Sequence, residues 1–133
     1  NLASRSPWEP LRGYSRAVKV GNQVFISGTT AVDGNGEVVA PGEYYKQAKF
    51  IMGRVQEILK RAGGDLSHVV RTRLYVTNLN KWDEYAQAHR ETFEKIRPAS
   101  SIVQVTRLVD PRLTIEMEVD AVLESELVEE LKV

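Results

Sequence analysis

The 133-residue chain is long enough to bury a core within one domain, and its 42% hydrophobic and 27% charged residues exclude an intrinsically disordered protein. Its 18 lysines and arginines equal its 18 aspartates and glutamates, so no net charge attracts nucleic acid or anionic lipid. The chain has no cysteine, which excludes disulfides, thiolate catalysis and cysteine-ligated metals.

The first half of the chain predicts a β-hairpin followed by a helix. Two β-rich runs, residues 14–20 and 23–27, are joined by Gly21-Asn22, which is a common two-residue hairpin turn. Pro41-Gly42 then opens a helix that extends to about residue 62 and stops at a pair of glycines. The apolar positions of this helix repeat at spacings of three and four, so one face is buried: Ala48, Ile51, Met52, Val55, Ile58 and Leu59.

The second half predicts a strand, a helix and two further strands. Residues 69–77 alternate, with Val70, Thr72, Leu74 and Val76 on one side and Arg71, Arg73 and Tyr75 on the other. A helix over 81–96 ends before Pro98, and strands follow at 101–106 and 113–123. The order ββ-α-β-α-ββ predicts one α+β domain over 1–133, a two-layer arrangement with two helices on one face of a mixed sheet. Residues 1–10 form an N-terminal arm and residues 124–133 a C-terminal extension.

The last strand predicts one apolar face and one acidic face. Its odd-numbered residues from Ile115 to Leu123 are apolar, whereas Glu116, Glu118 and Asp120 alternate with them. The acidic residues should share the open face of the sheet with Arg71 and Arg73. Such a face is solvated, or is the inner wall of an oligomer where charges pair, or carries catalytic residues. The pattern leaves these three interpretations open.

Several motifs together resemble the signature of the Rid (YjgF) family. Residues 97–105 read RPASSIVQV, Arg107-Leu108 follows, and residues 115–118 read IEME. Ser27-Gly28 after the second strand and the strand-forming run 69–79 also match, so the resemblance covers about residues 6–121. It implies the chorismate-mutase-like fold, a homotrimer with a small-molecule pocket at each subunit interface, and cofactor-free hydrolysis of enamines or imines. The pattern by itself equally allows a monomeric two-layer sandwich.

The resemblance also implies roles for individual residues. Glu116 falls on the catalytic glutamate that positions the attacking water, and Tyr14 and Ser27 fall on residues that line the pocket. The family's carboxylate-binding arginine lies two residues after the proline, where this chain has Ser100. Ser100 and Ile102 are therefore placed in the substrate-binding segment, but a serine hydroxyl does not replace the paired N–H donors of a guanidinium.

Two further residues are candidates for contact with the ligand. Arg73 shares the predicted face of Glu116 and is the hypothetical substitute for the missing cation; the alternative is an ion pair between Arg73 and Glu118 or Asp120. His89 lies on the buried stripe of the second helix, where it is either a packed imidazole or a proton carrier at the pocket edge.

Three functions follow from these patterns. The first is a hydrolytic deaminase of small enamines or imines, the second is a non-catalytic trimer that binds a small metabolite, and the most remote is a ribonuclease or translation inhibitor. The two histidines are twenty-one residues apart and form no metal-binding pattern, so we expect neither a metal nor a cofactor. Without a signal-peptide core or a run of about 20 apolar residues, the sequence favours a cytoplasmic protein that binds neither membrane nor nucleic acid.

Overall fold

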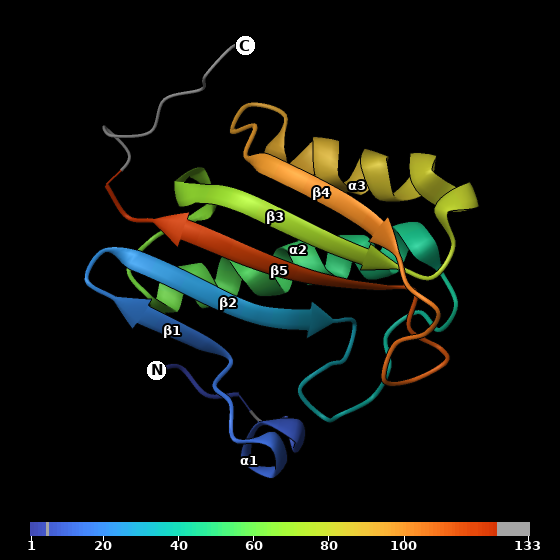
Figure 1. Cartoon of the computed structure of the whole chain (residues 1–133), viewed down its shortest axis with the longest axis horizontal. Helices are drawn as coiled ribbons and strands as arrows, with labels where there is room; N and C mark the ends of the chain where they lie inside the picture. Colours follow the sequence, from blue (N-terminus) through green and yellow to red (C-terminus); the bar gives the residue numbers. More distant parts are fainter. Residues whose placement is uncertain (5, 125–133) are drawn as a thin grey trace.

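A computed structural model describes residues 1–4 and 6–124, in which five strands form one mixed sheet in the order β1-β2-β5-β3-β4 (Figure 1). The strands are β1 (Ala17–Val20), β2 (Gln23–Thr30), β3 (Val69–Val76), β4 (Ala99–Gln104) and β5 (Ile115–Val122). Neighbouring strands are antiparallel except β3 and β4, which are parallel. The parallel pair follows from the crossover through a helix between them.

Two long helices cover one face of the sheet and leave the other face open. These are α2 (Tyr44–Arg61) and α3 (Trp82–Phe93), while a short helix α1 (Trp8–Arg12) lies near the N-terminus (Figure 1). Short 3₁₀ turns, η1 (Leu66–His68) and η2 (Leu79–Lys81), precede β3 and α3. The α+β fold with two helices on one face of a mixed sheet confirms the prediction. None of the helices in the described part of the chain is long and apolar enough to cross a membrane.

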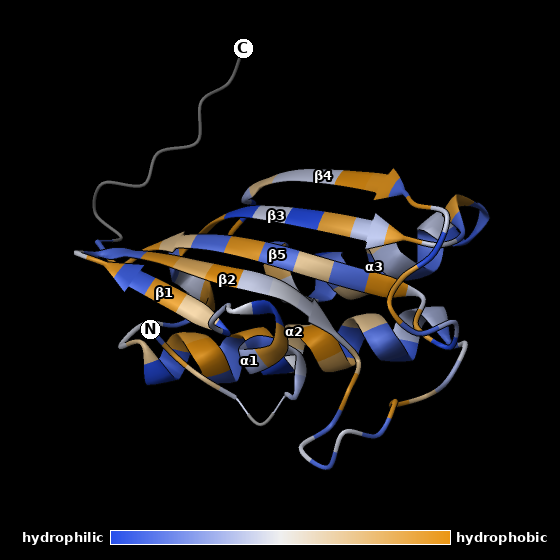
Figure 2. Ribbon diagram, turned by 60° about the horizontal axis from the view of Figure 1, so that its bottom comes forward, coloured by the Kyte–Doolittle hydropathy of each residue, from blue (hydrophilic) through white to orange (hydrophobic). Residues whose placement is uncertain are grey.

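The alternation predicted for the last strand is confirmed. Ile115, Met117, Val119 and Ala121 are each at most 2% exposed and face the helices, and the acidic residues between them face away. Figure 2 shows the resulting change between hydrophobic and hydrophilic colours along β5. The predicted buried stripe of α2 is likewise entirely in the core.

Two strands depart from the predicted alternation because each contains an irregularity. In β3 the register shifts between Val69 and Arg71, so Val69 is buried at 1% exposure and Val70, predicted to be inside, is only half-buried. In β2 the register shifts between Ile26 and Thr29, and the strand continues to Thr30 instead of ending at residue 27. Such bulges insert residues that a strict period of two does not anticipate.

The remaining differences concern where elements begin and end. The first strand begins at Ala17 rather than residue 14, because Gly13 ends α1 in the left-handed conformation and the chain then turns into the sheet. The second long helix covers Trp82–Phe93 rather than 81–96, and β4 covers Ala99–Gln104 rather than 101–106. The predicted extension from residue 125 onward lies outside the described residues.

Candidate functional site

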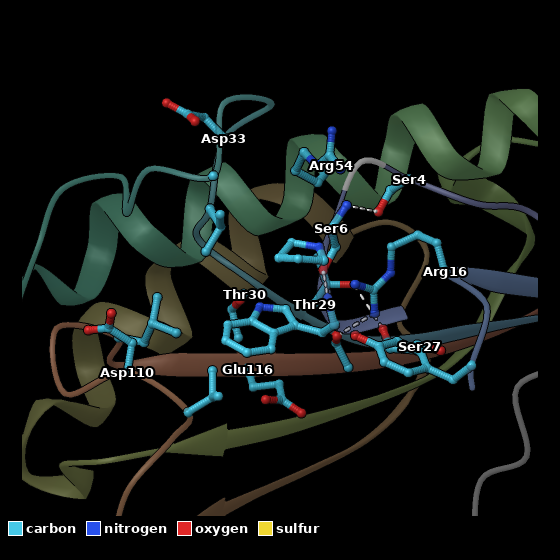
Figure 3. A pocket seen from close by; sticks show the side chains of 18 of the residues that line it. Ser4, Ser6, Arg16, Ser27, Thr29, Thr30, Asp33, Arg54, Asp110 and Glu116 are labelled. Carbon is cyan, nitrogen blue, oxygen red and sulfur yellow. Dashed lines mark hydrogen bonds between the residues drawn. The ribbon is translucent and has the colours of Figure 1, made fainter. Parts of the chain in front are cut away.

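A pocket of about 900 Å³ opens where the sheet meets the N-terminal arm. Its walls are α1 with the segment before it, the irregular part of β2, two arginines of α2, the loops over 32–38 and 109–113, and the start of β5. Figure 3 shows Glu116 on one side of this pocket, with Arg16 and Ser27 lying together beside it. The pocket therefore combines residues from both ends of the chain.

The irregularity in β2 shapes the pocket wall. Ser27 donates its hydroxyl to the carbonyl of Ser15 at 2.7 Å, and its backbone N–H donates to the carbonyl of Arg16 at 3.0 Å. At Gly28 a β-carbon would overlap the Oε2 atom of Glu116. A glycine at this position lets the Glu116 carboxylate lie directly against the backbone of β2.

Glu116 has the properties of a general base. Its side chain is half-buried, and burial together with the nearby Glu118 raises its pKa above the usual range of a glutamate. Arg16 and Arg12 oppose this shift but do not cancel it. None of the described residues donates a hydrogen bond to the Glu116 carboxylate, which leaves it available for a water or ligand.

Tyr14 lies next to two arginines at the pocket edge. The guanidinium of Arg12 is 4.5 Å from the centre of the Tyr14 ring, and that of Arg16 is 5.8 Å away. Both distances allow a cation–π interaction. Arg54, Arg61 and Arg112 also line the pocket, and of its five arginines Arg12 and Arg16 are close enough to Glu116 to act on its pKa. Four acidic residues, Asp33, Asp110, Glu116 and Glu118, line the same pocket, so the lining has a small excess of positive charge near Tyr14 that favours a ligand with negative charge.

Three of the site residues predicted from the sequence lie in this pocket, whereas the predicted cation, Arg73, lies outside it. Glu116, Tyr14 and Ser27 line it together. Arg73 does not line it: its Nη1 is 3.4 Å from the carboxylate of Asp120 on the open face of the sheet. This ion pair is the alternative expected for Arg73 from the alternation of the strands.

Ser100, Ile102 and His89 also lie outside the pocket within one chain. Thr72, which is fully buried, donates its hydroxyl to the Ser100 Oγ at 2.7 Å, and its Oγ1 is 2.8 Å from the His89 Nε2. Ile102 pairs in register with the buried Leu74 and packs against the core. Burial lowers the pKa of His89, as expected for a neutral packed imidazole. The ligand contacts expected for these three residues stay predictions.

The sequence analysis did not identify Arg16 or the helix that carries Arg12. One signal was present: Arg16 is two residues after Tyr14, a spacing that places two side chains on one side of an extended segment. Among residues 1–4 and 6–124, the structure contains no cluster of three or more histidine or acidic side chains that could hold a metal ion.

Comparisons with known proteins identify a matching family, related proteins and similar solved structures. The model of the endoribonuclease L-PSP family matches residues 4–123. The chain is 33% identical to 3-aminoacrylate deaminase RutC of Acinetobacter baylyi over 81% of this chain and 85% of that one. It is also 33% identical to 2-iminobutanoate/2-iminopropanoate deaminase of Mus musculus over 71% and 70% of the two chains. The crystal structure of Rv2704 from Mycobacterium tuberculosis, of the YjgF/YER057c/UK114 family, superposes with a TM-score of 0.82 and 39% identity over 91% and 96%.

Proposed function

Because the chain belongs to the endoribonuclease L-PSP (YjgF, Rid) family, we propose that it hydrolyses small enamines or imines and releases ammonia. Two relatives are named as deaminases of 3-aminoacrylate and of 2-iminobutanoate and 2-iminopropanoate, which are compounds of this class. The observation that carries the proposal is Glu116: a half-buried carboxylate with a raised pKa and no hydrogen-bond donor among the described residues. This is the environment in which a carboxylate accepts a proton from water.

The reaction needs only a positioned water and a base. An enamine first takes up a proton at carbon and becomes an iminium ion, whose carbon is electrophilic. Glu116 holds a water and accepts its proton while the oxygen attacks that carbon. Glu116 then gives its proton to the amino group of the carbinolamine, the carbon–nitrogen bond breaks and ammonia leaves. The hydroxyl loses its proton to solvent as the carbonyl forms, which balances the proton taken up at carbon, so one water is consumed for each ammonia released. Tyr14 and Ser27 form the wall against which the substrate lies.

The test is ammonia release from freshly generated 2-aminoacrylate, corrected for uncatalysed hydrolysis. We expect Glu116→Gln to lower kcat/KM by about 10²- to 10⁴-fold, the usual contribution of a positioned general base. Glu94→Gln changes an exposed glutamate after α3 and should leave turnover unchanged. Full turnover in the Glu116→Gln variant would remove Glu116 from the mechanism. A native protein that releases no ammonia but binds the product would instead support a non-catalytic binding protein.

The pH dependence provides a second arm of the same test. Glu116 accepts a proton only when ionised, so kcat/KM should fall as the pH decreases through its pKa. Since burial raises that pKa, the fall should come at a higher pH than for an ordinary glutamate. The effect of this substitution on stability should be opposite to its effect on turnover. Because the native state disfavours ionised Glu116, the Glu116→Gln variant should be at least as stable as the native protein at neutral pH. A melting curve therefore separates lost chemistry from lost folding.

We also propose that three copies associate through the open face of the sheet. This face carries acidic and basic side chains of β5 and β3, with Phe25 and Val103 exposed at 42% and 46%. Glu116 and Glu118 belong both to this face and to the pocket, so a neighbouring copy would help to enclose the ligand. The closed assembly would exclude bulk solvent from the pocket and leave the water that Glu116 holds.

A further inference from the structure

Arg16 is a buried cation without a counter-ion. It is 8% exposed, and no carboxylate in the described part of the chain forms an ion pair with it. Its Nη2 donates to the carbonyl of Gly28, while its buried Nε has no acceptor. Buried charges in proteins are normally paired, because removing an isolated charge from water is costly. An unpaired guanidinium in a pocket wall is a group that a bound anion would stabilise.

The two nearest acidic residues do not fill this role. Glu9 accepts hydrogen bonds from the backbone and the hydroxyl of Ser4, which hold its carboxylate to the N-terminal arm. Glu116 lines the same pocket, but its carboxylate lies against Gly28 and forms neither an ion pair nor a hydrogen bond with Arg16. Both carboxylates are within electrostatic range of Arg16 without neutralising it.

We propose that Arg16 is the residue of this chain that binds the carboxylate of the ligand. This inference rests on the proposed function for the reactive part of the ligand. In the resembling family an arginine at the position of Ser100 binds the carboxylate. In this chain Arg16 makes that contact. It does so from the chain segment that also carries Tyr14, within the same subunit as Glu116.

The position of Gly28 links the cation to the base. Arg16 donates to the carbonyl of Gly28, and the Glu116 carboxylate lies against the place where a β-carbon of Gly28 would be. Arg16 and Glu116 thus flank one residue. In a 2-imino acid the electrophilic carbon is bonded directly to the carboxylate carbon. A carboxylate held by Arg16 therefore brings the reacting carbon next to a water on Glu116.

Arg12 and Arg54 add to the attraction for an anion. Both line the pocket, and Arg12 lies against the Tyr14 ring that also contacts Arg16. Arg54 lies close enough to lower the pKa of Arg16, although burial is the larger cause. Arginine stays protonated at physiological pH, so the pocket keeps this positive charge throughout the working range.

The experiment measures the binding of 2-oxobutanoate and of its uncharged amide, 2-oxobutanamide, by calorimetry. We expect the native protein to bind the acid at least about tenfold more tightly than the amide, as for a hydrogen bond to a charged group. Arg16→Gln should abolish this preference by weakening acid binding alone, and Arg16→Lys should keep part of it. Arg90→Gln, a change of an exposed arginine in the last turn of α3 and away from the open sheet face, should have no effect.

Two results would overturn the inference: equal affinity of the native protein for acid and amide, or an unchanged preference in the Arg16→Gln variant. If that variant does not fold, NMR on the native protein decides the matter. The Nε–H signal of Arg16 should shift when 2-oxobutanoate is added and stay in place with the amide; no shift with the acid contradicts the proposal.

Turnover separates this inference from the proposed function. Acid-selective binding through Arg16 without ammonia release would reject the deaminase and keep the carboxylate site. Ammonia release with an unchanged KM in Arg16→Gln would keep the deaminase and reject the carboxylate site. Glu116→Gln should retain the acid preference while losing turnover, because it changes the base and not the cation.

Discussion

At the scale of single residues, the missing side chain of Gly28 determines where Glu116 can lie. The carboxylate of Glu116 occupies the space that a β-carbon at Gly28 would take, and the Gly28 carbonyl accepts from Arg16. One small residue thus contacts both the base and the cation of the proposed mechanism. The neighbouring Ser27 fixes the irregular part of β2 to the preceding segment, because its hydroxyl donates to the carbonyl of Ser15.

We therefore expect Gly28→Ala to lower ammonia release more than it lowers stability. The added methyl meets the end of a flexible side chain, so Glu116 is displaced while the fold changes its free energy of unfolding by only about 1 kcal/mol. Gly53→Ala is the matched control: its β-carbon meets nothing within 4 Å in α2, and the change should stabilise by about 0.5–1 kcal/mol. Turnover and urea unfolding measure both effects; a Gly28→Ala variant with native turnover would contradict this placement of the base.

At the scale of elements, a buried amide on α2 connects the loops that form the pocket. Gln47 is fully buried, and its Nε2 donates to the carbonyls of Val39, Ala40 and Arg112 at 3.2, 3.0 and 2.9 Å. Its Oε1 accepts from the backbone and the hydroxyl of Thr114. The loop after β2 and the segment before β5 are therefore fixed to the same helix side chain.

Replacing this amide with an apolar side chain should be strongly destabilising. Gln47→Met keeps a similar volume but leaves several buried carbonyl and N–H groups without partners, at a cost of about 2–4 kcal/mol. Gln56→Met alters the same helix at a half-buried glutamine and should cost under about 1 kcal/mol. Chemical unfolding of the two variants tests this difference, and equal stabilities would show that the Gln47 network contributes little.

At the scale of the whole molecule, the open face of the sheet is the surface that needs a partner. Arg71 and Arg73 both approach Asp120, at 3.8 and 3.4 Å, and Tyr75 hydrogen-bonds to Glu118. These contacts pair part of the charge of the face within one chain. Phe25 and Val103 are large apolar side chains exposed among them.

The proposed trimer predicts a mass in solution three times that of the chain. Phe25→Glu should shift the protein toward monomers, because it replaces an exposed apolar side chain of the proposed interface with a carboxylate that association would bury beside Asp120. Leu11→Glu, which alters an exposed leucine of α1, should leave the mass unchanged. Analytical ultracentrifugation over a range of concentrations measures both; a native protein that sediments as a monomer would rule out the trimer and support the two-layer sandwich alone.

The elements and their order could be predicted from the sequence because they follow from local periodicity. The spacing of three and four in α2 and the alternation in β5 each mark one buried face, and the structure confirms both. The two bulges could not be predicted. They depend on how β2 and β3 pair with β5, so Val69 replaces Val70 in the core without any local signal.

The candidate site divides in the same way. Glu116, Tyr14 and Ser27 were identified from motifs, and the structure brings them into one pocket. The sequence by itself thus determined the fold class, the family resemblance and the position of the proposed base. Only the tertiary structure decided which cation accompanies it. Arg73 shares a face with Glu116 but pairs with Asp120. Arg16 is far from Glu116 in the sequence, and it reaches the pocket because β2 pairs with both β1 and β5. Alternation along a strand shows which face a side chain occupies, but the distances between charges on that face depend on strand order and pairing.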